Sequence, residues 1–174
     1  MNLETKDLDD ATRADLPGQF VRLPDGVTHY ELSGPRDGPV VVLVNGFSAP
    51  YFTWDPTVGA LNEAGFRVLR YDLFGRGFSD RPGVTYDVSL FVRQLNDLLD
   101  ALHVDGPVHV AGLSFGGLVA ASFSVSPPER VRSLTLIDPQ AANVTAASIF
   151  PLATPPLGEY LMDVYIGPVR LPQT

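Results

Sequence analysis

The sequence predicts an α/β fold, with a mostly parallel sheet and helices that flank it. The first observation is the apolar, β-branched run Pro39–Val44, because strands of a parallel sheet are covered on both faces. The second is the segment Ser89–Leu102, in which apolar residues recur at helical spacing. The third is the alternation of strand-like and helix-like segments along the chain, which is typical of a parallel sheet with crossover helices.

The predicted strands are short and are separated by Gly- and Pro-rich turns. An early pair is joined by the turn Pro24-Asp25-Gly26, and the last predicted strand precedes Asp138. Apart from Pro39–Val44, the predicted strands are Phe20–Leu23, His29–Leu32, Arg67–Tyr71, Pro107–Leu113 and Val131–Ile137.

Three helices are predicted between these strands. Thr53–Ala64 should turn Leu61 and Ala64 inward and end at Gly65. Ser89–Leu102 should begin at an Asp87 cap. Gly116–Ser126 should end at Pro127-Pro128. The apolar residues expected on the buried face of the second helix are Phe91, Leu95, Leu98, Leu99 and Leu102.

The composition bounds the size and the partners of the protein. With 174 residues, of which 45% are hydrophobic, the chain can form one globular domain with a real core. The formal net charge is −8, so no basic stripe is available to bind nucleic acid. The chain has no cysteine and no apolar run of the roughly 20 residues that span a bilayer. We therefore expect a cytoplasmic protein without a membrane span, and no metal or cofactor motif is found.

Gly112-Leu113-Ser114-Phe115-Gly116 is the motif that carries most chemical information. It lies between an apolar strand and a small-residue helix, and a sharp turn at this point exposes a serine hydroxyl at the top of a sheet. A serine nucleophile needs a histidine to accept its proton, and in folds with this turn the histidine follows the serine in the chain. No histidine follows Ser114 in the 174 residues. The sequence thus predicts a nucleophile without its base.

Asn45-Gly46-Phe47 follows the buried strand Pro39–Val44 and forms a second candidate feature. A loop there can direct the Phe47 N–H toward the substrate oxygen, and the Phe115 N–H can do the same from the serine turn. The alternative is that Asn45-Gly46 is simply a turn.

Four stretches in this order resemble the α/β-hydrolase family of esterases, lipases and C–C hydrolases, over about residues 20–140. They are Val41-Val42-Leu43-Val44-Asn45-Gly46-Phe47, Tyr71-Asp72-Leu73-Phe74-Gly75-Arg76-Gly77-Phe78-Ser79-Asp80-Arg81-Pro82, Val110-Ala111-Gly112-Leu113-Ser114-Phe115-Gly116-Gly117 and Leu134-Thr135-Leu136-Ile137-Asp138-Pro139.

The resemblance implies a catalytic group of Ser114 as nucleophile with Phe47 and Phe115 as oxyanion donors. Because the turn residue is serine and not aspartate, it favours ester or related acyl substrates through an acyl-enzyme. Residues 1–17 are polar and acidic, which predicts a tail or a loosely docked arm. Under the resemblance, residues 18–140 are the N-terminal part of the hydrolase core and residues 141–174 begin the cap or lid. It further implies that the last strands of the sheet, the usual acid and the histidine are absent from these residues.

Asp138 is the candidate acid that remains, since some relatives place their acid after this strand. The alternative is a strand-end aspartate that caps a loop. The histidines His29, His103 and His109 all precede Ser114, so none is expected to be the base. For Asp72, Arg76 and Asp80 the resemblance favours a structural role beside the mouth of the site over acid–base chemistry.

Aromatic residues gather in the loops that follow the predicted strands, where parallel sheets bind ligands. We expect Gly46, Phe47, Trp54 and Phe115 to contact a small apolar acyl substrate. The alternative is that several of these rings only fill the core.

The functional hypothesis is a serine hydrolase acting on carboxylic esters or related acyl substrates, with this chain an incomplete and by itself inactive piece. The alternative is a non-catalytic module of the same fold that binds a small ligand or regulates. In both cases Val131–Ile137 is expected to be an uncovered apolar edge strand. Self-association, or a second chain that completes the sheet, is the partner hypothesis that follows.

Overall fold

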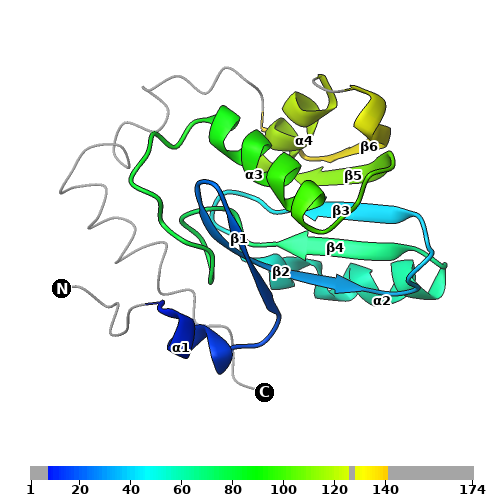
Figure 1. The fold of residues 1–174 in the computed structure, drawn as a ribbon. Helices are drawn as coiled ribbons and strands as arrows, with labels where there is room; N and C mark the ends of the chain where they lie inside the picture. Colours follow the sequence, from blue (N-terminus) through cyan, green and yellow to red (C-terminus); the bar gives the residue numbers. More distant parts are fainter. Residues whose placement is uncertain (1–7, 126–127, 141–174) are drawn as a thin grey trace. The chain divides into compact units, whose positions relative to one another are not determined.

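A computed structural model describes residues 8–125 and 128–140 of the chain (Figure 1). In these residues six strands form one mixed sheet in the order β1-β2-β4-β3-β5-β6. Strands β4, β3, β5 and β6 are parallel, whereas β1 pairs antiparallel with β2 and β2 antiparallel with β4. The predicted α/β fold class is confirmed. The strand bounds are β1 Gln19–Leu23, β2 Gly26–Ser33, β3 Val40–Val44, β4 Arg67–Tyr71, β5 Val108–Leu113 and β6 Val131–Ile137.

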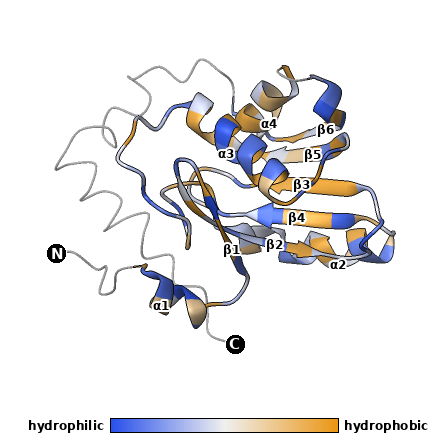
Figure 2. Ribbon diagram, viewed as in Figure 1, coloured by the Kyte–Doolittle hydropathy of each residue, from blue (hydrophilic) through white to orange (hydrophobic). Residues whose placement is uncertain are grey.

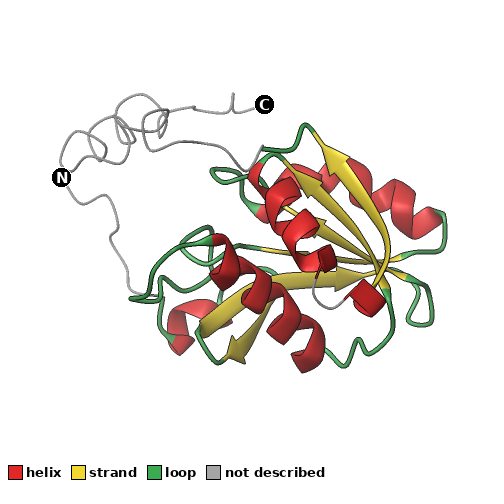
Figure 3. Ribbon diagram, turned by 90° about the horizontal axis from the view of Figure 1, so that it is seen from above, coloured by secondary structure: helices red, strands yellow, loops and turns green. Residues whose placement is uncertain are grey.

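Helices lie on both faces of this sheet, as the view from above shows (Figure 3). The connections after β3, β4 and β5 each carry helical segments, so the parallel strands are joined by crossovers as expected. The segments are α1 Asp10–Ala14, η1 Tyr51–Trp54, α2 Asp55–Glu63, α3 Val88–Ala101, α4 Phe115–Val125 and η2 Pro128–Arg130. No helix in the described residues is long and apolar enough to cross a membrane.

Strand β3 is hydrophobic along its length because it is buried from both sides (Figure 2). Val42 and Val44 belong to the larger core, to which α3 and α4 contribute. Val41 and Leu43 face the opposite way and pack in a smaller core with Trp54 and the α2 residue Val58. Burial on both faces therefore explains the continuous apolar run, as the sequence indicated.

Helix α3 confirms both its predicted cap and its predicted buried face. The Asp87 side chain accepts a hydrogen bond from the Leu90 N–H, which satisfies one of the free donors at the helix start. Phe91 and three leucines of the predicted face are almost fully buried, and Leu102 packs half-buried at the end of the helix.

The predicted helix Thr53–Ala64 differs in detail. The segment begins as the 3-10 turn η1 and becomes helical only at α2, which has a proline in its first positions. Val58 is the buried residue of α2, while Leu61 is half-buried and Ala64 is exposed. Ala64 was expected to face inward, but it is the C-cap, and the chain leaves the helix there through Gly65 at φ +88°.

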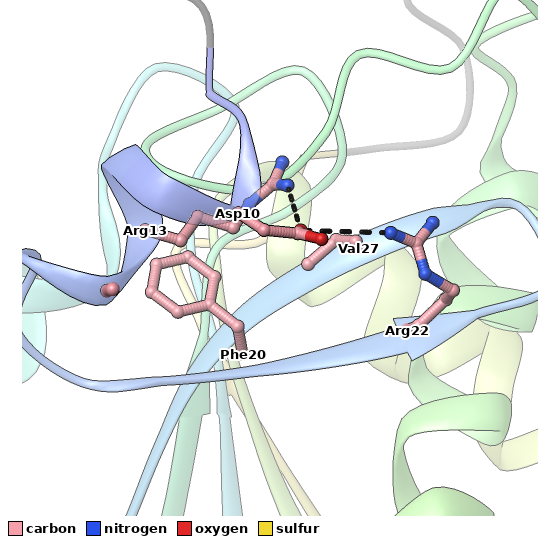
Figure 4. Close-up of a pocket in the computed structure, with 6 residues that line it drawn as sticks. Asp10, Arg13, Phe20, Arg22 and Val27 are labelled. Carbon is pink, nitrogen blue, oxygen red and sulfur yellow. Dashed lines mark ion pairs between the residues drawn. The ribbon is translucent and has the colours of Figure 1, made fainter.

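Residues 8–17, which the sequence places in a polar tail, include the short helix α1. Its Arg13 is buried at 8% exposure and donates to Asp80, in the loop after β4. A cavity of about 370 Å³ lies between α1 and the β1–β2 pair, and Asp10 stands there between Arg13 and Arg22 (Figure 4). None of the predicted site residues lines this cavity. The predicted cap, residues 141–174, lies outside the described residues.

Candidate functional site

Ser114 lies at the turn between β5 and α4 in a left-handed backbone conformation, with φ +52°. Such a conformation is unusual for a residue with a side chain and marks a constrained position. Backbone hydrogen bonds hold it: the Ser114 N–H donates to the Ile137 carbonyl at 3.0 Å, and the Ser114 carbonyl accepts from Gly117 and Gln140 at 2.9 Å. The Ser114 residue is nevertheless exposed.

Three glycines around Ser114 are required by close backbone contacts. A Cβ on Gly112 would lie 2.2 Å from the Gly116 carbonyl oxygen. A Cβ on Gly116 would lie 2.3 Å from the Val44 carbonyl oxygen, at the end of β3. A Cβ on Gly117 would lie 2.8 Å from the Pro139 side chain. The glycines thus let α4 start directly against the ends of β3 and β6.

The loop after β3 lies beside the serine. A Cβ built on Gly46 would be 3.6 Å from the Ser114 Cβ, an ordinary contact distance. Asn45 holds the start of this loop from a fully buried position. Its amide nitrogen donates to the Tyr71 carbonyl at 2.9 Å, and its amide oxygen accepts from the Trp54 indole N–H at 3.0 Å. The asparagine therefore ties the loop to the end of β4 and to η1.

Phe47 and Phe115 meet across the two loops. Their rings form an edge-to-face contact with centroids 5.6 Å apart. Phe47 is 48% exposed, whereas Phe115 is buried and also contacts Phe91 of α3. Phe115 is the first residue of α4, so its N–H has no partner within the helix. No hydrogen bond within the described residues occupies the N–H of Phe47.

The structure brings together most of the predicted site residues. Gly46 lies beside Ser114, Phe115 follows it in the chain, and Phe47 contacts the Phe115 ring. Asp138 directly follows β6 in a left-handed conformation, φ +43°, and is exposed. It lies in the same turn as Ile137 and Gln140, the two residues that bond to the Ser114 backbone. Trp54 is different: its side chain is buried in the smaller core and bonded to Asn45, which is a supporting position.

The histidines occupy other positions. Both ring nitrogens of His29 are bonded, one to Asp72 at 2.8 Å and the other to the Pro17 carbonyl at 2.9 Å. The His109 ring is bonded to Ser133 at 2.7 Å and lies five residues before Ser114 on the same strand, about 16 Å away at 3.3 Å per residue. His103 follows the C-terminus of α3 at φ +53°.

Asp72, for which a structural role was expected, joins several segments near the site. Its buried carboxylate accepts from His29, from the Tyr51 N–H at 3.0 Å and from the Phe78 N–H at 3.1 Å. It joins the loop after β3 to the loop after β4. Gly77 leaves room for this carboxylate, because an added Cβ there would lie 2.1 Å from it.

Electrostatic shifts near the site come mainly from burial. Burial raises the pKa of Tyr71 and Tyr51, although the cation of Arg70 opposes the shift at Tyr51, so both phenols stay neutral near pH 7. Burial lowers the pKa of Arg76. The side chain keeps its charge near pH 7, because the ordinary pKa of an arginine lies far above that pH. Arg76 lies over the Phe47 ring, with its guanidinium carbon 4.1 Å from the ring centroid.

A strand, a sharp serine turn and a helix on the parallel part of a mixed sheet define the class of fold. Comparisons with known proteins identify it. The family model for the alpha/beta hydrolase fold matches residues 39–162. The chain belongs to the alpha/beta hydrolase family.

Particular relatives are hydrolases by name. Carboxylesterase YbfK of Bacillus subtilis (strain 168) is 31% identical over 127 residues, which are 72% of this chain and 42% of YbfK. A hydrolase from Pseudomonas aeruginosa PA01 superposes with a TM-score of 0.73 at 30% identity, covering 83% of this chain and 56% of that structure. The enol-lactonase from Burkholderia xenovorans LB400 gives a TM-score of 0.73 at 26% identity, over 85% and 58% of the two chains. The chain spans about two fifths of the length of the curated relatives that it matches.

Proposed function

We propose that this chain carries the nucleophile and the oxyanion donors of a serine hydrolase that acts on carboxylic esters or related acyl substrates. The observation that supports this most is the exposed Ser114 in a left-handed turn directly beside the Gly46 loop. Strain held by surrounding hydrogen bonds is common at catalytic positions. The hydrolase names of the relatives agree with this class of reaction.

In the proposed reaction the Ser114 oxygen bonds to the acyl carbon of the substrate, and the serine proton passes to a base. The oxygen of the acyl group becomes negative, and the N–H groups of Phe47 and Phe115 stabilise it. Collapse then expels the alcohol, which takes the proton from the base, and leaves an acyl-enzyme that water hydrolyses. Asp138, in the turn beside Ser114, is the candidate acid.

The base is proposed to be a histidine outside these 174 residues. Both nitrogens of His29 are already bonded, and His109 lies too far along β5 to reach Ser114. No histidine follows Ser114 in the sequence. Residues 1–174 alone should therefore retain only the weak catalysis that an oxyanion site provides without a base.

The substrate is proposed to be small and apolar on its acyl side. Phe47 presents half of its surface to solvent beside the serine, and its ring leads to Phe115 and Phe91. Such a row of rings offers contact area to an apolar group but few hydrogen bonds.

The test is covalent labelling and turnover with the protein produced from its full reading frame. A fluorophosphonate should label Ser114, located by peptide mass spectrometry, and p-nitrophenyl esters of short acids should release p-nitrophenol. Ser114→Ala should abolish labelling and lower kcat by at least about 1,000-fold, because the nucleophile is lost.

Ser124→Ala is the matched control, since Ser124 lies in α4 and donates only to the Ala121 carbonyl. It should keep labelling and turnover. Unchanged turnover in Ser114→Ala would contradict the proposal that Ser114 is the nucleophile. Absence of any labelling, together with binding of an apolar ligand beside Phe47, would favour the non-catalytic ligand-binding module instead.

A further inference from the structure

Arg76 holds the residue that carries one of the proposed oxyanion donors. The Arg76 Nε donates to the carbonyl oxygen of Phe47, and the guanidinium lies 4.1 Å from the centroid of the Phe47 ring. One side chain thus contacts the same residue through its backbone and through its ring. A second guanidinium nitrogen donates to the Gly75 carbonyl at 2.8 Å, which fixes the orientation of the plane.

Arg76 itself is held rigidly. Its N–H donates to the Leu73 carbonyl at 2.9 Å, and its carbonyl accepts from the Ser79 N–H at 3.1 Å. Gly75 and Gly77 on either side have φ of +77° and +49°, so the backbone turns sharply around the arginine. A fixed backbone lets a long side chain keep one position at lower entropic cost.

Phe47 has few other restraints. It is 48% exposed. Besides Arg76, the contact of its ring within the described residues is the edge-to-face pair with Phe115. Asp72 ties the two loops together at Tyr51 and Phe78, but not at Phe47. Phe47 is therefore held by Arg76 at its carbonyl and ring and by Phe115 at its ring. The preceding peptide has one bond of its own, since the Gly46 carbonyl accepts from the Ala49 N–H at 3.3 Å.

We propose that Arg76 is a positioning residue for catalysis. By donating to the Phe47 carbonyl and lying over its ring it fixes this residue, and so orients the Phe47 N–H toward the acyl oxygen at Ser114. The inference rests on the proposed serine hydrolase function. It assigns Arg76 no contact with the substrate and no proton transfer. Its effect should fall on the transition state, where the negative oxygen forms, more than on substrate binding.

The experiment measures ester hydrolysis by Arg76→Ala in the protein from its full reading frame. We expect kcat to fall about 10- to 100-fold, as for a modest misplacement of a catalytic group, with KM changing less than about threefold. Arg76→Lys should be intermediate, because an ammonium keeps the charge over the ring but not the planar, two-donor geometry. Methylguanidine added to Arg76→Ala should restore part of kcat.

Arg93→Ala is the matched control. Arg93 is an exposed arginine of α3 that pairs with Asp25, and its removal should leave kcat and KM unchanged. If kcat of Arg76→Ala stays within threefold of the parent, or if KM alone changes, the positioning role is wrong while the serine mechanism stands.

A second measurement does not depend on turnover. Amide hydrogen exchange of the segment 45–49 should accelerate in Arg76→Ala relative to α3, because the loop loses its restraint. Unchanged exchange would overturn the inference, even for a protein that proves to be inactive. If the parent protein has no hydrolase activity but exchange is faster in the variant, the proposed function is wrong. The structural restraint of Phe47 by Arg76 would then still hold.

Discussion

Asn45 shows how one buried side chain can shape the loop that carries Gly46 and Phe47. The position directly follows β3. The asparagine amide meets a carbonyl on one side and an indole N–H on the other, so both of its polar ends are satisfied. The asparagine therefore anchors the loop from both ends of its amide.

Asn45→Ala should destabilise the protein by about 2–3 kcal/mol, because it leaves the Tyr71 carbonyl and the Trp54 N–H without this partner in a buried place. Urea unfolding measures the change. Gln19→Ala is the control, since this amide is exposed at the start of β1 and makes no side-chain hydrogen bond within the described residues, and we expect a change within about 0.5 kcal/mol. Equal effects at the two positions would show that the Asn45 bonds contribute little.

At the scale of elements, the turn from β5 into α4 depends on space and not only on backbone angle. Gly112, Gly116 and Gly117 all face backbone or proline atoms that a methyl group would overlap. Close contact of α4 with β3 and β5 brings Ser114 beside Gly46. The same residues that form the turn therefore determine how the two loops of the site meet.

Gly116→Ala and Gly59→Ala should change stability in opposite directions. At Gly116 the new methyl would overlap the Val44 and Asn45 carbonyl oxygens, so we expect a loss of at least about 2 kcal/mol and a loss of fluorophosphonate labelling. At Gly59, inside α2, nothing lies within 4 Å, and alanine should stabilise by about 0.5–1 kcal/mol. Thermal and urea unfolding of both variants test the pair, and a stable, labelled Gly116→Ala would contradict it.

At the scale of the whole molecule, β6 forms one edge of the sheet within the described residues. Leu134, Leu136 and Ile137 are between 36% and 44% exposed there. An apolar edge strand offers unpaired backbone groups to another chain. We propose that residues 1–174 self-associate through this edge.

Leu136→Lys should shift residues 1–174 toward monomer in sedimentation velocity, because a charge on an edge strand opposes strand addition. Val125→Lys is the control: Val125 is 76% exposed but lies on α4, and its replacement should leave association unchanged. The net charge of −8 should make the parent associate more strongly as salt is raised. A parent that stays monomeric at all concentrations and salts would end this proposal.

Much of the fold follows from patterns that can be read along the chain. Arg67–Tyr71 and Val131–Ile137 are strands with the predicted bounds, and the Asp87 cap is where the sequence indicated. These features arise from neighbouring residues, such as a capping carboxylate or a run of β-branched side chains. Ala64 was misjudged because helical spacing alone does not show where a helix ends.

The supporting contacts could not be predicted in the same way. The hydrogen bond from Arg76 to Phe47 joins residues 29 positions apart in the sequence. The bond between Asp72 and His29 joins residues 43 positions apart. Such pairs depend on which strand ends lie side by side, and the strand order β2-β4-β3-β5 sets that.

The sequence by itself determined the class of fold, the order of its strands and helices along the chain, and the serine turn, because local spacing and composition carry that information. Only the tertiary structure decided which loops meet at Ser114, that Trp54 supports the site from the core, and that Arg76 holds Phe47. The physical reason is that these contacts join residues distant in sequence, whose proximity arises only when the parallel strands pair and their carboxyl ends come together at one edge of the sheet.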